Sequence, residues 1–112
     1  TDVYGKQVAT TVKNDTGLRY PRTVQYFKTA ESEGKVLHPT QKPLALMEYL
    51  VKTYSNEGDM VLDNVMGSGT TCVAAALHNR RFIGIEMDEG YFDIARDRIE
   101  KTQEFENEIK IL

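Results

Sequence analysis

The residues best suited to chemistry lie in a glycine-rich stretch, residues 63–71, with the sequence DNVMGSGTT. Gly67 and Gly69 let the backbone approach a ligand closely and adopt conformations that other residues avoid. The helix expected after them presents unpaired N–H groups in its first turn, and such groups bind anions. Asp63 can accept hydrogen bonds from a cationic group. These residues therefore predict a ligand site, although a simple tight turn between a strand and a helix would use the same glycines.

The stretch differs from two common phosphate-binding loops. It contains no Gly-Lys-Ser/Thr triplet, so it is not a P-loop. Cys72 stands where the dinucleotide fingerprint has its third glycine. We therefore expect a ligand without a pyrophosphate. The carboxylate and ammonium of a methionine-type group suit the site better, with the N–H groups on the carboxylate and Asp63 on the ammonium.

Two further segments could complete such a site. Glu86 is expected at the end of the next strand, where a carboxylate can accept hydrogen bonds from both hydroxyls of a ribose. A solvated acid at a strand end is the alternative. Residues 38–43, with the sequence HPTQKP, form a rigid and polar approach to a helix because prolines restrict the backbone. His38 has no cluster of other potential ligands around it in the sequence, so we expect no metal site.

The elements that must position these residues follow from hydrophobic periodicity. We expect a helix from Pro43, with one apolar face, and a helix over residues 70–79. Short apolar runs predict buried parallel strands that end at Asp63 and at Glu86. Asp88 is expected to cap a third helix. A strand, a glycine loop, a helix and a strand make a βαβ unit, so both acids should reach one crevice beyond the carboxyl ends of the strands.

The remaining segments are less regular. We expect residues 1–37 to form an irregular or β lead-in segment, with short strands over residues 8–12 and 24–27. Residues 31–34 predict an exposed loop, and residues 109–112 a last strand. The whole chain of 112 residues is short enough to be one domain.

Composition sets broad limits. The chain is 40% hydrophobic and 28% charged, which is ordinary for a soluble globular protein, and we find no membrane span and no signal peptide. A single cysteine, Cys72, fits a reducing cytoplasm. Residues 1–56 carry eight basic and five acidic side chains, while the remainder carries six and twelve. The more basic N-terminal half could face phosphate groups, although an ordinary distribution of charges over a solvated surface would give the same numbers.

Taken together, these motifs resemble a known family. The HPTQKP segment, a helix, a strand and the DNVMGSGTT stretch are similar, in this order, to the cofactor block of the N6-adenine and N4-cytosine DNA methyltransferases. Residues 81–88, RFIGIEMD, followed by Tyr91, also match the family pattern. The resemblance covers residues 38–99 closely and residues 19–22 more loosely. The motif order is that of the permuted class of this family.

The resemblance implies a Rossmann-like α/β fold, here in part, with residues 38–112 as the βαβ region that binds S-adenosylmethionine. It implies that Glu86 binds the ribose and that Met87 and Asp88 lie near the adenine. Many family members have Pro-Phe in place of Asn64-Val65, so positioning of the target base can differ here. The residues that the resemblance places at the methionine end of the cofactor are His38, Thr40, Gln41, Lys42, Asp63, Met66, Gly67, Ser68, Gly69 and Thr70.

The catalytic tetrapeptide of the family, Asp/Asn/Ser-Pro-Pro-aromatic, does not occur in the sequence. In the permuted class it lies upstream of the HPTQKP segment, so we interpret a chain that begins at Thr1 as the cofactor-binding portion of an enzyme, and we assign no catalytic residue. The resemblance implies direct methyl transfer to a flipped-out base, in which Cys72 is a buried helix residue and not a nucleophile.

We expect a cytoplasmic, site-specific DNA methyltransferase of the restriction–modification type that acts on adenine N6, with DNA as its partner. A non-catalytic module that binds S-adenosylmethionine or completes a partner's fold is the alternative. A nicotinamide-dependent dehydrogenase is disfavoured because the third glycine is missing. An unpaired sheet edge would allow a homodimer.

Overall fold

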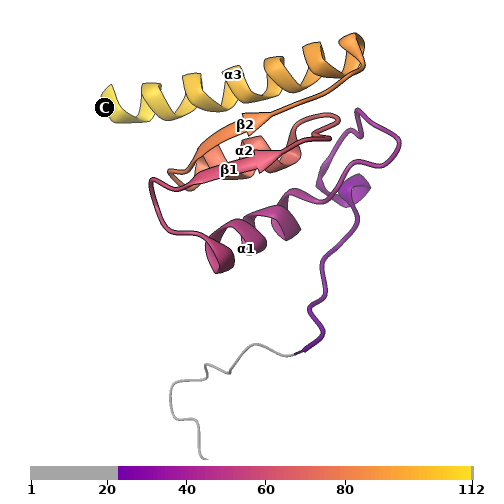
Figure 1. Ribbon diagram of the computed structural model, residues 1–112, viewed down its shortest axis with the longest axis horizontal. Helices are drawn as coiled ribbons and strands as arrows, with labels where there is room; N and C mark the ends of the chain where they lie inside the picture. The colour runs from indigo at the N-terminus through magenta and orange to yellow at the C-terminus, as the bar shows by residue number, and fades with distance from the viewer. Residues whose placement is uncertain (1–22, 112) are drawn as a thin grey trace, which may run out of the picture.

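The structure, a computed structural model, describes residues 23–111, and side chains are described as far as Phe105. The predicted strand over residues 8–12 therefore lies outside the described part. The elements, in chain order, are the 3₁₀ helix η1 (Ala30–Glu33), α1 (Leu44–Tyr54), β1 (Met60–Asp63), α2 (Thr70–Leu77), β2 (Arg81–Gly84) and α3 (Glu89–Ile111) (Figure 1).

The two strands pair in parallel, with Met60 opposite Arg81 and Asp63 opposite Gly84. The pairing extends beyond both ends of the strands: Arg81 N donates to Asp59 O at 2.9 Å, and Ile85 N donates to Asp63 O at 2.9 Å. Helix α2 is the connection between the strands. The predicted βαβ unit, and with it an α/β fold with a parallel sheet, is confirmed.

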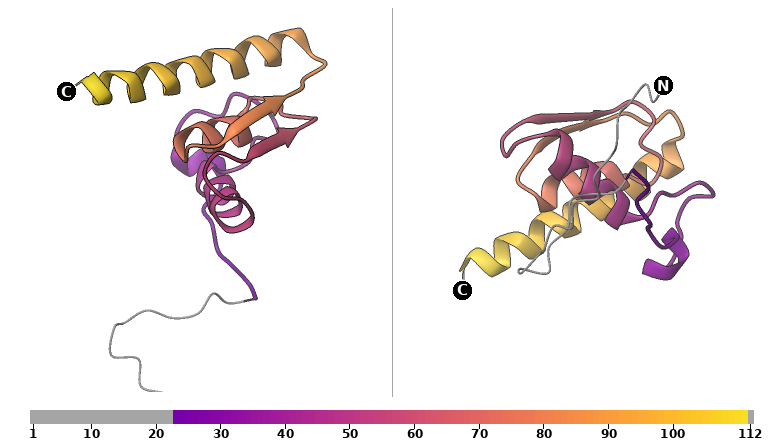
Figure 2. Two further views of the ribbon diagram at one scale, coloured as in Figure 1. Left: turned by 60° about the vertical axis from the view of Figure 1, so that its left-hand side comes forward. Right: turned by 90° about the horizontal axis from the view of Figure 1, so that it is seen from below.

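Helix α2 is the centre of the packing. It contacts α1, α3 and both strands, and Figures 1 and 2 show it behind the sheet, between α1 and α3. Its residues are small: Ala74 and Ala75 are fully buried, and Cys72 is almost so. Ala95 of α3 is also fully buried. Small side chains allow the neighbouring elements to approach closely, which is why so short a helix can pack against four other elements.

The sequence predicted that both faces of the strands are buried, but in the described part of the chain only one face is covered. Val61 and Phe82 point to the helical side and are half-buried, whereas Leu62 and Ile83, on the other side, are 62% and 49% exposed. The reason is that the described helices all lie on one side of the sheet (Figure 2). An unbroken apolar run is typical of a strand covered on both faces, and here one cover is absent from the described residues.

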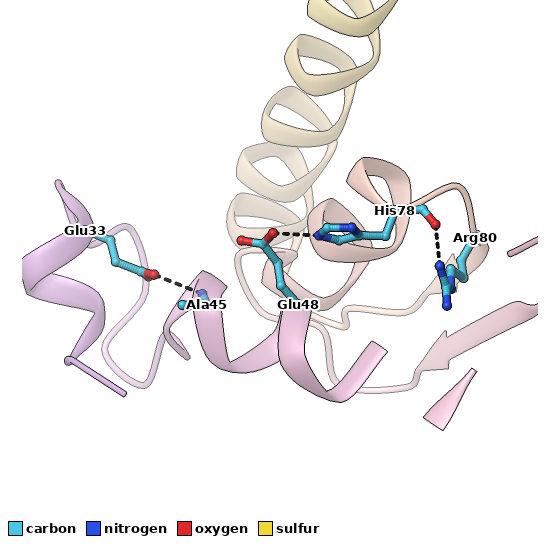
Figure 3. Close-up of polar contacts among 5 residues, drawn as sticks. All are labelled: Glu33, Ala45, Glu48, His78 and Arg80. Carbon is cyan, nitrogen blue, oxygen red and sulfur yellow. Dashed lines mark hydrogen bonds and ion pairs between the residues drawn. The ribbon is translucent and has the colours of Figure 1, made fainter. Parts of the chain in front are cut away.

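Helix α1 begins one residue later than predicted, since Pro43 precedes it and offers no side-chain cap. The cap comes from η1, which forms where the sequence predicted an exposed loop over residues 31–34. Glu33 accepts a hydrogen bond from Leu44 N at 2.5 Å. It accepts another from Ala45 N at 2.9 Å (Figure 3). A carboxylate at this end of a helix also complements the helix dipole.

Two polar contacts join α1 to the end of α2 (Figure 3). Glu48 Oε2 lies 2.6 Å from His78 Nε2. Arg80 donates to His78 O at 2.6 Å and to Ser55 O at 2.7 Å, which ties the last turn of α1 to the turn before β2. Arg80 thus complements the carboxyl end of α2, while Arg81 belongs to β2 and donates to Gly58 O.

Three further boundaries differ from the predictions. Strand β2 ends at Gly84, two residues before Glu86. Residues 24–27 form no strand, and Phe27 packs its ring on Tyr49 with the centroids 5.5 Å apart. The predicted last strand is helical, because α3 continues to Ile111. Beyond Gly90 no glycine or proline interrupts α3, so nothing in its sequence ends the helix earlier. The predicted cap is confirmed: Tyr91 N donates to Asp88 Oδ1 at 2.9 Å.

Gly69 and Gly58 make a matched pair for a stability test. Both have a left-handed backbone, with φ of 84° and 86°, but a Cβ on Gly69 would lie 2.9 Å from Ala95 Cβ, while one on Gly58 would meet open space. We expect Gly58→Ala to cost about 1 to 2 kcal/mol through its backbone alone. Gly69→Ala should cost about 1 to 3 kcal/mol more, because α3 must move. Chemical unfolding of both variants measures the difference, and equal losses would contradict this packing.

Candidate functional site

A cavity of about 440 Å³ opens beside the carboxyl end of β1 and the glycine loop. Ten of the residues that the sequence placed at the cofactor line it, together with Met47, Val65 and Thr71, which the sequence did not single out. The ten are His38, Thr40, Gln41, Lys42, Asp63, Met66, Gly67, Ser68, Thr70 and Glu86. Segments far apart in the sequence therefore meet at one site.

Three predicted residues do not line the cavity. Gly69 is buried against Ala95, so its role in the structure is to let α3 approach. Met87 is fully exposed, and Asp88 caps α3. The proximity of Met87 and Asp88 to an adenine ring stays a prediction.

The glycine loop is wound tightly at the start of α2. Gly69 N donates to Met66 O at 2.9 Å, and the first helical bond runs from Val73 N to Gly69 O, also at 2.9 Å. The N–H groups of Thr70, Thr71 and Cys72 consequently have no acceptor within the helix. Thr70 and Thr71 line the cavity, so this end of α2 can donate hydrogen bonds to an anionic group there.

Asp63 and Glu86 both line the cavity, as expected for the ends of adjacent parallel strands. Asp63 Oδ1 accepts a hydrogen bond from Val65 N at 3.1 Å, and its second oxygen has no partner among the described residues. Glu86 is half-buried and also has no partner there. Glu86 reaches the cavity even though β2 has ended, because Met66 N donates to Ile85 O at 3.0 Å and holds the chain beside the loop.

His38, Thr40, Gln41 and Lys42 form another part of the cavity wall. The His38 ring packs on Tyr91 of α3, with centroids 4.2 Å apart, and covers Gly67, where an added Cβ would lie 3.3 Å from the ring. His38 Nδ1 accepts a hydrogen bond from Thr40 N at 3.1 Å. Because Nδ1 is an acceptor, the neutral ring carries its proton on Nε2. Among the described residues, no group of His, Cys, Asp and Glu could hold a metal ion.

Polar contacts join this wall to the loop and to α3. Gln41 Oε1 accepts hydrogen bonds from Leu37 N and from Ser68 Oγ, both at 3.0 Å. Arg98 donates to Ser68 O at 2.7 Å and to Thr70 Oγ1 at 3.2 Å. Arg98 was not predicted as a site residue, because no local sequence signal distinguishes a partly buried arginine from the exposed charged residues of a polar helix.

Gly84 is a second residue that the sequence analysis passed over. A Cβ there would lie 2.3 Å from Met66 Sδ and 2.7 Å from Cys72 Sγ. A glycine inside a strand often marks such a close approach, and this signal was present in the sequence. Gly84 lets Met66 and Cys72 pack beneath the strand and so keeps the loop close to β2.

Cys72 is 1% exposed, as expected for a buried helix residue. Burial, and to a smaller extent the charge of Asp63, raises the pKa of its thiol to about 11. The thiol therefore stays protonated near neutral pH and is a poor nucleophile.

The chemistry of the cavity suits a ligand with opposite charges and hydroxyl groups. The start of α2 and Lys42 favour an anion, Asp63 favours a cation, and Glu86 offers acceptors for hydroxyls. The sulfur of Met66 and the side chains of Met47 and Val65 supply apolar surface between them.

Comparison with known proteins gives three kinds of match. A family of DNA methylases matches residues 3–97. The type II methyltransferase M2.DpnII of Streptococcus pneumoniae is 49% identical over 67 residues, which are 60% of this chain and 25% of that protein. The chain thus spans about a quarter of the length of this curated relative.

Two solved structures share the fold. The crystal structure of an M1.HpyAVI–SAM complex matches 72% of this chain and 42% of that one, with a TM-score of 0.62 and 42% identity. The cytosine-N4-specific PvuII DNA methyltransferase matches 71% of this chain and 31% of that one, with a TM-score of 0.54 and 28% identity.

Proposed function

The chain belongs to the N6/N4 DNA methylase family, and from this premise we propose that its cavity binds S-adenosylmethionine for methyl transfer to an exocyclic amino group of a DNA base. The observation that carries the proposal is the meeting of the HPTQKP segment, the glycine loop, Asp63 and Glu86 around one cavity. The similar M1.HpyAVI structure is described as a complex with this cofactor.

The donors and acceptors of the cavity fit the cofactor group by group. The free N–H groups at the start of α2 suit the carboxylate of its methionine part. The unpartnered oxygen of Asp63 suits the ammonium. Glu86, which also lines the cavity, suits the two ribose hydroxyls.

S-adenosylmethionine supplies a methyl group on a positively charged sulfur, and a base amino group can accept this methyl directly, with no covalent intermediate on the protein. The residues of this chain would align the methionine and ribose ends and thereby fix the methyl group between them. The buried, protonated thiol of Cys72 agrees with a role outside the chemistry.

We propose adenine N6 as the target. The identity to the cytosine-N4-specific PvuII enzyme is 28%, which is too low to carry its target base over to this chain. The alternative is a non-catalytic module that binds S-adenosylmethionine or completes a partner's fold.

Binding of the cofactor is tested by calorimetric titration of S-adenosylmethionine. We expect Asp63→Ala and Glu86→Ala each to weaken binding by about 10-fold or more, because each removes a charge-assisted hydrogen bond. Asp97→Ala is the matched control, since Asp97 is an exposed acid that pairs with Lys101 outside the cavity. Unchanged binding by both cavity variants would contradict the assigned site.

Methyl transfer is tested separately. DNA incubated with the protein and S-adenosylmethionine is digested to nucleosides and analysed by mass spectrometry. We expect N6-methyladenine, and N4-methylcytosine would contradict the choice of base. If a protein that binds the cofactor yields neither product, the non-catalytic alternative replaces the enzymatic one.

DNA is the proposed partner, the cytoplasm the proposed location, and self-association a further possibility to be tested. No helix in the described part of the chain combines the length and the apolar character needed to cross a bilayer. The outer face of the sheet exposes Met60, Leu62, Ile83 and Ile85, and within residues 23–111 each strand has one edge without a paired strand. We propose a homodimer through this face. Sedimentation should show a dimer that Ile83→Lys converts to a monomer, and a monomeric unsubstituted chain would contradict it.

A further inference from the structure

Arg98 lies behind the cofactor cavity and contacts the glycine loop from α3. Its Nη1 atom donates to Ser68 O at 2.7 Å, to Ser68 Oγ at 3.1 Å and to Thr70 Oγ1 at 3.2 Å. Ser68 and Thr70 line the cavity, but Arg98 does not. Arg98 can therefore influence a ligand only through the loop residues that it holds.

The position of Arg98 is demanding for a charged group. Burial lowers the pKa of its guanidinium, and the charge of Glu33 acts in the opposite direction. An arginine stays protonated even so. A partly buried cation needs compensating hydrogen bonds, and the acceptors that provide them here all belong to the loop. The loop and Arg98 consequently hold each other in place.

Arg98 and Leu37 lie at the two ends of a chain of hydrogen bonds through Ser68 and Gln41, and they fix the direction of each bond in it. At one end Arg98 can only donate, so Ser68 Oγ accepts and its own proton is free to point to Gln41 Oε1, 3.0 Å away. At the other end Leu37 N can only donate, so the Gln41 atom that it meets must be the oxygen. The amide of Gln41 therefore has one orientation.

This orientation leaves the two N–H groups of Gln41 Nε2 without a partner among the described residues. Gln41 lines the cavity together with the start of α2, where N–H groups are also free. Both sets of donors suit one anionic group of a ligand.

We propose that Arg98 is a positioning residue of the cofactor site: through the Ser68 hydroxyl it orients the Gln41 amide so that its N–H groups bind the carboxylate of the ligand's amino acid part. The inference rests on the proposed function and goes beyond it, because it assigns a role to a residue outside the cavity. It also predicts which part of the ligand depends on that residue.

The test compares two ligands that differ only at the amino acid end. S-adenosylhomocysteine carries the carboxylate and ammonium, whereas 5′-methylthioadenosine keeps the adenosine and the sulfur but lacks both. Affinities are measured by calorimetry, with displacement titrations for the weaker ligand. We expect Arg98→Met to weaken S-adenosylhomocysteine by about 10-fold while changing 5′-methylthioadenosine by less than about 2-fold. Arg98→Lys, which restores a donor, should recover part of the loss.

Two further variants make the result specific. Ser68→Ala removes the middle of the relay and should reproduce the selective loss, so it decides the question if Arg98→Met does not fold. Arg96→Met is the control, because Arg96 lies on the same helix, pairs with Asp93 at the surface and should leave both affinities unchanged.

Other outcomes overturn the inference. Equal weakening of both ligands, or no change in either, means that Arg98 does not orient the carboxylate site. A selective loss in Arg98→Met that Ser68→Ala does not share excludes the relay through Ser68. If the unsubstituted protein binds neither ligand, the proposed function itself fails, and this result is distinct from the others.

Discussion

The whole arrangement depends on the contact between Gly69 and Ala95, where the glycine loop and α3 meet without a side chain between them. A methyl group on Gly69 would lie 2.9 Å from Ala95 Cβ, so only glycine permits this approach. Because α3 lies so close, Arg98, one turn beyond Ala95, reaches the loop from behind. The loop residues Gly67, Ser68 and Thr70 are thereby held at the cavity, and their small side chains leave room for a ligand.

Small residues elsewhere in the structure likewise bring the two acids, Asp63 and Glu86, together. Gly84 lets Met66 and Cys72 pack beneath β2, and the alanines of α2 let that helix lie against both strands. The strands then end side by side, with Asp63 and Glu86 at the cavity. The charged side chains that line the cavity, Asp63, Glu86 and Lys42, offer opposite signs to one ligand. Packing of small residues is thus the link between the sequence and the chemistry that we propose.

Much of this could be predicted from the sequence. The βαβ unit, the cap at Asp88 and ten cavity residues follow from periodicity, glycine spacing and the family resemblance. The failures have physical causes. The exposed face of Leu62 and Ile83 was predicted as buried because a short apolar run does not show what covers it. The predicted strand after residue 108 is helical because its apolar residues continue a helix without a breaker. Arg98 was missed because its burial arises from tertiary contacts 28 and 30 residues away in the sequence.

The most direct test of the central claim is a crystal structure of the protein grown with S-adenosylhomocysteine. We predict that the ligand lies in the cavity with its carboxylate at the start of α2 and the Gln41 amide, its ammonium at Asp63 and its ribose hydroxyls at Glu86. A ligand bound elsewhere, or bound in the cavity with its ribose at the glycine loop and its amino acid at Glu86, would contradict the account.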